Sequence, residues 1–296
     1  MMGQREAMSN MQYQTLHQLI KLAAEHNKRI SEIVLAVEAE QKQERPEVLR
    51  NQMLTIWHVM QQAIKRGLTE DVKSLSGLSG GDGKRLASVT PKLLSRQVAR
   101  AAATALAVGE VNAAMGRIVA CPTAGSCGIV PAALAFAMEQ FKLSEENVIM
   151  SLFTAAGIGI VCSLNASISG AEGGCQAECG VAAAMAAAAL TELGGGTPEQ
   201  VGHAVAFCLT NMLGLVCDPV AGLVEVPCIL RNAGAIMQAL LAAELALADI
   251  KSRIPADEVI GAMHEVGEAL PESLRETAKG GLANTPTGKR LRSRLP

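Results

Sequence analysis

Aromatic residues are scarce in this 296-residue sequence. Only 2% of the residues are Phe, Trp or Tyr, whereas 49% are hydrophobic. The large aromatic side chains that contribute much of the buried area in many cores are therefore few, and Ala, Gly, Leu and Met must fill the interior. Small side chains allow helices to approach one another closely. The composition therefore favours packed helices over a β-sandwich.

Excess charge of one sign is also missing. Charged residues make up 18% of the chain, and the formal net charge is −2. Proteins that bind nucleic acid or an anionic membrane through their bulk charge carry a basic excess, which this chain lacks. One short basic run, KRLRSRLP, occupies residues 289–296. We interpret it as a solvated end or a partner contact, and we expect no nucleic-acid partner.

No targeting segment is visible near the start of the sequence. His17, Lys21 and Lys28 interrupt any apolar run, and no small-residue cleavage pattern follows them. We therefore expect a cytoplasmic protein. In a reducing compartment the eight cysteines are expected to be core thiols, metal ligands or nucleophiles, and not a disulfide framework.

One stretch without formal charge, residues 147–171, is long enough to cross a bilayer. Serine, threonine and asparagine are spread through it, and no aromatic belt or basic flank accompanies it. We predict a buried helix that runs into a polar loop, without membrane contact.

Helical patterning dominates the chain. Residues 10–68 are expected to be helical, with Ser31 as the N-cap of a second segment and a third segment from residue 46 to about Arg66, ended by Gly67. Thr197 followed by proline indicates a further helix start. No strand is long enough to anchor a Rossmann sheet, so the predicted fold is all-α: one compact multi-helix domain over 1–296, with 1–72 as a possible N-terminal helical arm. Ala-rich helices are expected at 94–115, 130–140, 145–163, 177–193, 198–213, 228–250 and 257–270.

Four polar loops separate these apolar helices. They are dense in Gly, Ser, Thr, Asn and Pro, and a single one would be read as a turn. Four of them suggest convergence on a polar pocket whose backbone N–H groups face a small anionic ligand. The loops are residues 74–83, 121–128, 165–174 and 217–228.

Three cysteines adjoin breaks in the helical pattern: Cys175 follows two glycines, Cys217 precedes Asp-Pro, and Cys228 follows a proline. Helix ends and loops allow thiolates to point at a shared ion. Their spacing, C-x41-C-x10-C, matches neither a zinc ribbon nor a CxxC ferredoxin pattern. The spacing alone is weak support for a metal cluster.

The other five cysteines differ in setting. Cys162 and Cys208 lie inside apolar stretches and are interpreted as core residues. Cys179 lies one helical turn after the first of the three loop cysteines, so the two can face the same way. By the same reasoning from loops, Cys121 and Cys127 are rival metal ligands.

Several long motifs resemble the alpha subunit of iron–sulfur L-serine dehydratase. The resemblance covers nearly the whole chain from about Ser31 onward. It implies that Cys175, Cys217 and Cys228 bind a 4Fe–4S cluster, whose fourth iron takes no side chain of this subunit and receives the substrate. It also implies that the remaining cysteines are structural. The motifs are CPTAGSCGIVPA (121–132), NASISGAEGGCQAE (165–178), NMLGLVCDPVAGLVEVPCILRN (211–232) and GGLANTPTG (280–288).

The family activity implied by this resemblance is the conversion of L-serine to pyruvate and ammonia by β-elimination of water. The resemblance also implies a smaller beta subunit with a Ser-Ser-His-Thr motif, which this sequence lacks. We therefore expect the chain to need that partner, which can also supply the unidentified general base. Donors for the substrate carboxylate are hypothesised in two loops: Thr123, Gly125, Ser126, Asn165, Ser169 and Gly170.

Three alternatives are open on the same residues. A pyridoxal-phosphate dehydratase would need a Schiff-base lysine, and Lys73 and Lys84 flank a Gly-rich loop, but the expected strands are absent. A helical membrane or scaffold protein explains the composition but not the three loop cysteines. A cysteine desulfidase with a similar cluster is the more serious alternative for the substrate.

Overall fold

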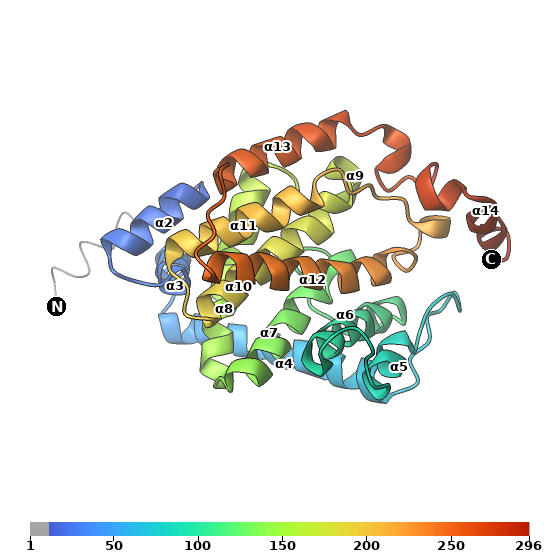
Figure 1. The fold of residues 1–296 in the computed structure, drawn as a ribbon, viewed down its shortest axis with the longest axis horizontal. Helices are drawn as coiled ribbons and strands as arrows, with labels where there is room; N and C mark the ends of the chain where they lie inside the picture. The colour runs from blue at the N-terminus through green and yellow to red at the C-terminus, as the bar shows by residue number, and fades with distance from the viewer. Residues whose placement is uncertain (1–11, 296) are drawn as a thin grey trace.

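A computed structural model of the chain describes residues 12–295, and that part contains helices and no β-strand (Figure 1). The all-α prediction is therefore confirmed. The helices are α2 (Leu16–Glu25), α3 (Ile30–Gln41), α4 (Pro46–Thr69), α5 (Asp82–Ser88), α6 (Arg96–Ala113), α7 (Ile129–Phe141), α8 (Glu145–Asn165), α9 (Gly170–Gly173), α10 (Val181–Leu193), α11 (Pro198–Met212), α12 (Cys228–Leu247), α13 (Ala256–Ala269) and α14 (Pro286–Arg292).

Helix α10 forms the centre of the core. Its sequence is VAAAMAAAALTEL, and every residue from Val181 to Glu192 is buried. Helices α7, α8, α11 and α12 all contact it, and α11 and α12 cross in front of it in Figure 1. Alanine side chains let these four helices approach α10 closely. This arrangement explains how the chain builds a core with so few aromatic residues.

The N-terminal helices pack on the outside of this centre. Helix α2 contacts α11, α3 contacts α8, and α4 contacts α6. In Figure 1, α2 and α3 lie at the end of the molecule opposite α14. Residues 10 and 11 of the first expected helical segment fall outside the described residues.

Three helices begin against carboxylates that come from other parts of the chain. The first backbone N–H groups of a helix have no partner within the helix, and a carboxylate at that end also interacts favourably with the helix dipole. The three carboxylates thereby fix where α2, α3 and α5 start. The pairs are Asp257 with the N–H groups of Leu16 and His17 (2.7 and 2.8 Å), Glu192 with that of Ser31 (3.1 Å), and Glu110 with those of Asp82 and Gly83 (2.7 and 3.3 Å).

Some predicted helix boundaries were wrong. Ser31 is not an N-cap, because α3 begins one residue earlier and buries Ser31 in its first turn. Gly67 does not end α4, which continues to Thr69. A side chain at Gly67 would overlap the carbonyl oxygen of Ala107, so this glycine serves close packing of α4 on α6. Residues 82 and 83, expected in a loop, open α5.

The seven expected Ala-rich helices are present. The predicted start at Thr197 is confirmed, since its hydroxyl accepts a hydrogen bond from the N–H of Gln200 (3.3 Å). Helices α8 and α12 are each long and apolar enough to cross a bilayer by length and composition, but 67% of the apolar window of α8 and 44% of that of α12 is buried in the protein. The prediction that α8 is a buried helix is confirmed.

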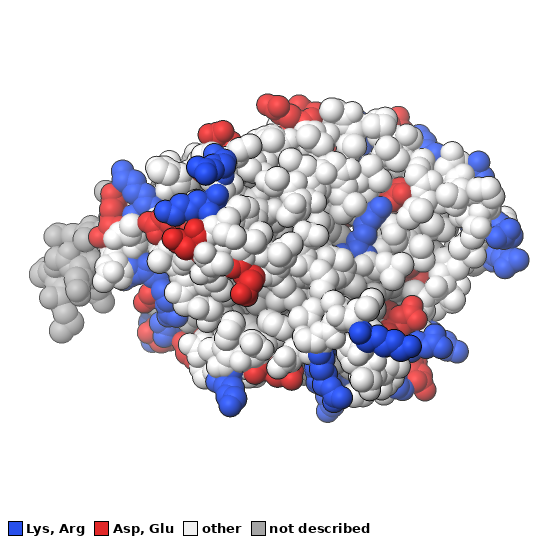
Figure 2. All heavy atoms as spheres, in the orientation of Figure 1, with Lys and Arg blue, Asp and Glu red and all other residues white. Residues whose placement is uncertain are grey.

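Charged side chains are unevenly distributed over the surface. On the face shown in Figure 2, lysine, arginine and acidic side chains lie mainly around the edge, and the middle of the face is largely uncharged. Helix α12 crosses this part of the molecule in Figure 1 and exposes Leu230 and Leu241 to solvent.

Candidate metal centre

Two cysteines and one glutamate meet at one end of α10. The sulfur atoms of Cys175 and Cys217 and a carboxylate oxygen of Glu178 all lie within 4.8 Å of one another. Both cysteines are buried, and Glu178 is partly buried. Thiolates and carboxylates are common ligands of transition metals. The group therefore fits a metal cofactor.

The first cysteine stands at a change in backbone geometry. Gly174, with φ of +75°, precedes Cys175, and residues Gln176–Gly180 form one turn of π-helix before α10 begins. The buried Gln176 side chain donates to the carbonyl of Met263 and accepts from the N–H of Gly214, both at 2.9 Å. These bonds fix the wide turn, a feature that is frequent at functional sites.

The second cysteine is held by its backbone. The N–H of Cys217 donates to the carbonyl of Leu274, and the carbonyl of Cys217 accepts from the N–H of Glu276, both at 2.8 Å. These two bonds make a short parallel bridge between Cys217 and Arg275. The segment after α13 therefore sets the position of this thiol.

An arginine from α12 lies beside the first thiol. The Arg231 guanidinium is 3.4 Å from the sulfur of Cys175 and donates to the carbonyl of Val216 (2.8 Å). It also pairs with the buried Asp218 (2.7 Å), whose second oxygen accepts from the N–H of Leu282 (2.7 Å). The cation is thus oriented by three direct contacts, and one of its partners, Asp218, is itself held by a backbone N–H group.

These surroundings place a negative charge on one sulfur. Hydrogen bonds from the thiols of Cys179 and Cys217, and the charge of Arg231, lower the pKa of Cys175 to about 3 against the effect of burial. The hydrogen bond to Cys175, together with burial, raises the pKa of Cys217 and of Cys179. Burial raises the pKa of Cys228 to about 12. Of these thiols, Cys175 is therefore the one whose surroundings favour the thiolate.

The third predicted ligand stands slightly apart. Cys228 is buried at the first residue of α12, and its sulfur is not part of the group that lies within 4.8 Å. The charges of Cys175 and Glu178 still contribute to its raised pKa, so it shares their electrostatic environment. The structure thus brings two of the three cysteines close together and puts the third nearby.

Sequence reasoning missed Glu178. Burial raises the pKa of this carboxyl to about 7, and a hydrogen bond with the Thr123 hydroxyl opposes that rise. The negative charges of Cys175 and Glu276 raise the pKa further. Its position one helical turn after Cys175, in the sequence CQAE, is the signal that could have identified it.

Three of the six hypothesised substrate residues border this carboxylate. Thr123 lies near Glu178 and lowers the pKa of its carboxyl group. A Cβ atom at Gly125 would lie 3.5 Å from one carboxylate oxygen, and one at Gly170 would lie 2.7 Å from the other and 3.1 Å from the sulfur of Cys217. Two loops far apart in the sequence therefore meet at Glu178.

The other three have different contacts. The hydroxyl of the buried Ser126 donates to the carbonyl of Cys121 (3.0 Å), and the amide of Asn165 donates to the carbonyl of Gln14 (2.7 Å). Ser169 lies directly before α9. Ser126 and Asn165 are thus engaged in holding the backbone.

Asn232 ties the loop of residues 121–128 to α12. Its side-chain oxygen accepts from the N–H of Gly128 (2.9 Å), and its amide donates to the carbonyls of Gly125 (2.7 Å) and Cys228 (2.8 Å). The residue is buried, so these partners have no ready access to water. One side chain thereby holds the loop against the start of α12.

We expect the substitution Asn232→Ala to lower the free energy of unfolding by about 1–3 kcal/mol, because it leaves buried backbone groups without partners. Urea unfolding followed by circular dichroism measures the change. Asn51→Ala, on the exposed face of α4, is the matched control and should leave stability nearly unchanged. Equal stabilities for the two variants would contradict this role of Asn232.

The remaining polar loop reaches the site through another acid. The buried Glu225 accepts hydrogen bonds from the hydroxyls of Ser76 (2.8 Å) and Ser79 (2.7 Å). Loop 74–83 is thereby attached to loop 217–228, while loops 121–128 and 165–174 meet at Glu178. The four loops therefore lie near one another, and the anion-binding pocket expected among them stays a prediction.

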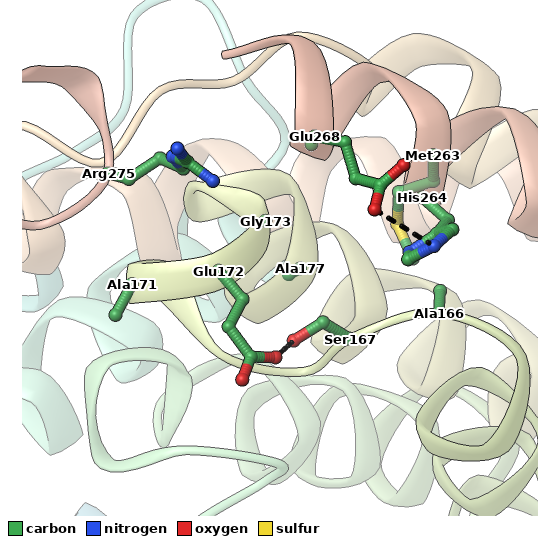
Figure 3. A pocket seen from close by; sticks show the side chains of 11 residues that line it. Ala166, Ser167, Ala171, Glu172, Gly173, Ala177, Met263, His264, Glu268 and Arg275 are labelled. Atoms are coloured by element: carbon green, nitrogen blue, oxygen red, sulfur yellow. Dashed lines mark hydrogen bonds and ion pairs between the residues drawn. The ribbon is translucent and has the colours of Figure 1, made fainter. Parts of the chain in front are cut away.

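A cavity of about 300 Å³ adjoins the cysteine group. It lies between α9 and α13, and its wall includes Gly173 and Ala177, which flank Cys175 in the sequence (Figure 3). In Figure 3 the Glu172 side chain turns toward Ser167, whereas Glu268 turns toward His264. The charged and polar side chains that line the cavity are those of Ser167, Glu172, His264, Glu268 and Arg275.

The two lysines considered for a Schiff base lie elsewhere. Lys84 forms an ion pair with Asp71 at the surface (2.6 Å), and Lys73 is exposed. Within residues 12–295 no strand is present to build the sheet that such an enzyme would use. Nothing in this geometry favours the pyridoxal-phosphate alternative.

Comparison with known proteins gives consistent matches over most of the chain. Residues 25–283 match the family described as Serine dehydratase alpha chain. The chain is 49% identical to the "Probable L-serine dehydratase, alpha chain" of Bacillus subtilis (strain 168), over 96% of this chain and 95% of that protein. It is 43% identical to the "L-serine dehydratase, alpha chain" of Peptoniphilus asaccharolyticus, over 94% and 96%. It also matches "L-serine dehydratase 1" of Escherichia coli (strain K12) at 52% identity, over 60% of this chain and 40% of that protein.

Proposed function

Because this chain belongs to the serine dehydratase alpha chain family, we propose that it is the alpha subunit of an L-serine ammonia-lyase, which converts L-serine to pyruvate and ammonia. The observation that carries the proposal is the group formed by Cys175, Cys217 and Glu178 beside Arg231. The chemistry is a β-elimination: the α-proton and the β-hydroxyl group leave serine, and the resulting enamine tautomerises and hydrolyses to the products.

The donor set is compatible with a 4Fe–4S cluster. Such clusters are held by cysteine thiolates in sites where hydrogen bonds and burial tune the sulfurs. Cys175, Cys217 and Cys228 are the residues that would hold it, and buried thiols next to the Arg231 guanidinium suit a negatively charged cluster. When bound, the cluster would supply Lewis acidity for the departure of the hydroxyl group.

The residues of the chain have separate tasks in this proposal. Arg231, fixed by Asp218, keeps the sulfur of Cys175 negatively charged and oriented. We propose that the substrate carboxylate binds to backbone N–H groups of the loops that contain Thr123, Gly125 and Gly170, which border the site. Ser126, Asn165 and Ser169 would act by holding these loops.

We propose that a beta chain completes the enzyme in the cytoplasm. Two relatives bear the words "alpha chain" in their names, and the chain covers only 40% of the longer Escherichia coli relative. None of the five histidines of this chain belongs to the cysteine group. The base that removes the α-proton is therefore expected from the beta chain.

An anaerobic assay tests the proposal. The chain, combined with its cognate beta chain and reconstituted with iron and sulfide, should form pyruvate from L-serine. L-threonine and L-cysteine serve as comparison substrates, and removal of iron by a chelator should abolish the activity. If the two-chain preparation is fully loaded with iron and leaves L-serine unchanged, the proposed function is wrong.

A further inference from the structure

We propose that Glu178 binds the ammonium group of the substrate and thereby selects an amino acid over a hydroxy acid of the same shape. The inference rests on the proposed function and names a residue that determines specificity within that site.

Two acids near the cysteines already have partners. Asp218 pairs with Arg231 and accepts a backbone N–H group. Glu225 accepts two serine hydroxyls. By contrast, no lysine or arginine within residues 12–295 forms an ion pair with Glu178, whose carboxylate accepts from the Cys217 thiol at 4.0 Å. Burying a carboxylate without a cation costs free energy, and a bound cation would offset that cost.

Two glycines lie directly against the carboxylate. Gly125 faces one oxygen of Glu178 and Gly170 faces the other. A Cβ atom at Gly170 would come within 2.7 Å of the carboxylate, so a side chain there would crowd it. The two loops thus border Glu178 without a side chain of their own at these two points. Glu178 itself is only partly buried, so a small ligand group can reach its carboxylate.

The location suits the two functional groups of serine. The nitrogen and the hydroxyl oxygen of serine stand on neighbouring carbon atoms, so the groups that bind them must lie close together. The carboxylate of Glu178 is within 4.8 Å of the sulfurs of Cys175 and Cys217, next to which the hydroxyl group must leave. A ligand with its hydroxyl toward the cysteines can therefore reach Glu178 with its nitrogen.

The local charge favours a cation at this point. Arg231 is already paired with Asp218. The carboxylate of Glu178 has no such ion pair within residues 12–295, so it can attract an ammonium group bound beside the two sulfurs. Hydrogen bonds between charged partners are also stronger than neutral ones. The site thus favours a ligand that has an amino group next to Glu178 over one that lacks it.

The test compares two ligands on the iron-loaded alpha–beta enzyme. L-serine and 3-hydroxypropanoate, which lacks the amino group, are titrated while the electron paramagnetic resonance or absorbance change of the iron centre is recorded. The substitution Glu178→Gln removes the charge at nearly constant shape. We expect it to weaken serine binding roughly 10- to 100-fold and to change 3-hydroxypropanoate binding by no more than about threefold. Glu265→Gln, on the exposed side of α13, is the control and should change neither.

Each other result overturns the inference. Equal weakening of both ligands would make Glu178 a structural residue. Loss of iron, or an altered spectrum before any ligand is added, would make it a metal ligand. If the wild-type enzyme and the Glu178→Gln variant respond identically to serine, Glu178 does not bind the ammonium group. The proposed function would then remain intact. A loaded wild-type enzyme that does not respond to serine at all would reject both.

Discussion

Replacement of Cys175, Cys217 or Cys228 by alanine, one at a time, is expected to abolish the iron centre and with it serine turnover. Loss of one thiolate leaves too few ligands, and even changes in residues that merely orient metal ligands cost about 10- to 100-fold in affinity or activity. We therefore expect each variant to lose activity by at least about 100-fold. Anaerobic reconstitution followed by iron and sulfide analysis, and by the broad sulfur-to-iron absorbance near about 400 nm, measures the effect.

Cys208→Ala provides the matched control. Cys208 is a buried thiol in α11, outside the cysteine group, so this variant loses a sulfur of similar burial and should keep its iron. The variant at Cys228 is the most informative one. If it binds iron as well as the wild type does, the ligands are the closer set of Cys175, Glu178 and Cys217, and the assignment made from sequence is wrong.

The second large effect is a loss of stability, expected when the buried ion pair between Asp218 and Arg231 is broken. Asp218 and Arg231 lie 2.7 Å apart, and their side chains are only 3% and 15% exposed. Asp218→Ala leaves the arginine buried without its partner, and breaking such a pair from one side costs about 3–5 kcal/mol of unfolding free energy. It also removes the acceptor for the N–H of Leu282. Urea unfolding of the metal-free protein measures the loss.

A surface pair of similar geometry serves as the control. Lys279 and Glu272 lie 2.6 Å apart but are 65% and 70% exposed, so Glu272→Ala should leave the unfolding midpoint almost unchanged. The loss of unfolding free energy in Asp218→Asn should lie between those of Asp218→Ala and Glu272→Ala. Asparagine keeps an oxygen for the Leu282 N–H group but loses the charge. If Asp218→Ala were as mild as Glu272→Ala, the proposed role of this pair in fixing Arg231 would fail.

The helices were predicted well from the sequence because the residues that start and bury a helix lie within that helix or next to it. The Thr197-Pro198 start needs only neighbouring residues, and the apolar sequence of α8 reflects its own burial. Predictions went wrong where a distant contact decided the outcome. Gly67 lies inside α4, where its contact with Ala107 leaves no room for a side chain, and Ser31 lies inside a helix whose start is fixed by Glu192.

The candidate site was predicted in part. Breaks in the pattern identified the loops and the cysteines, because Gly and Pro mark turns whatever the tertiary fold. The partners of these groups could not be found in this way. Arg231 and Asp218 are thirteen residues apart, and Glu225 meets serines that lie 146 and 149 residues earlier. Only the packing of α12 against the loops brings such residues together.

The capping of α2 has a consequence for how the protein is synthesised. The carboxylate that accepts its first N–H groups, Asp257, lies 241 residues later in the chain. As the ribosome makes proteins from the N-terminus, α2 cannot adopt its final contacts until α13 has left the exit tunnel. A ten-residue helix is marginal by itself in water. The nascent chain therefore keeps the apolar side of α2 uncovered for most of translation, the interval in which a chaperone would be of most use to it.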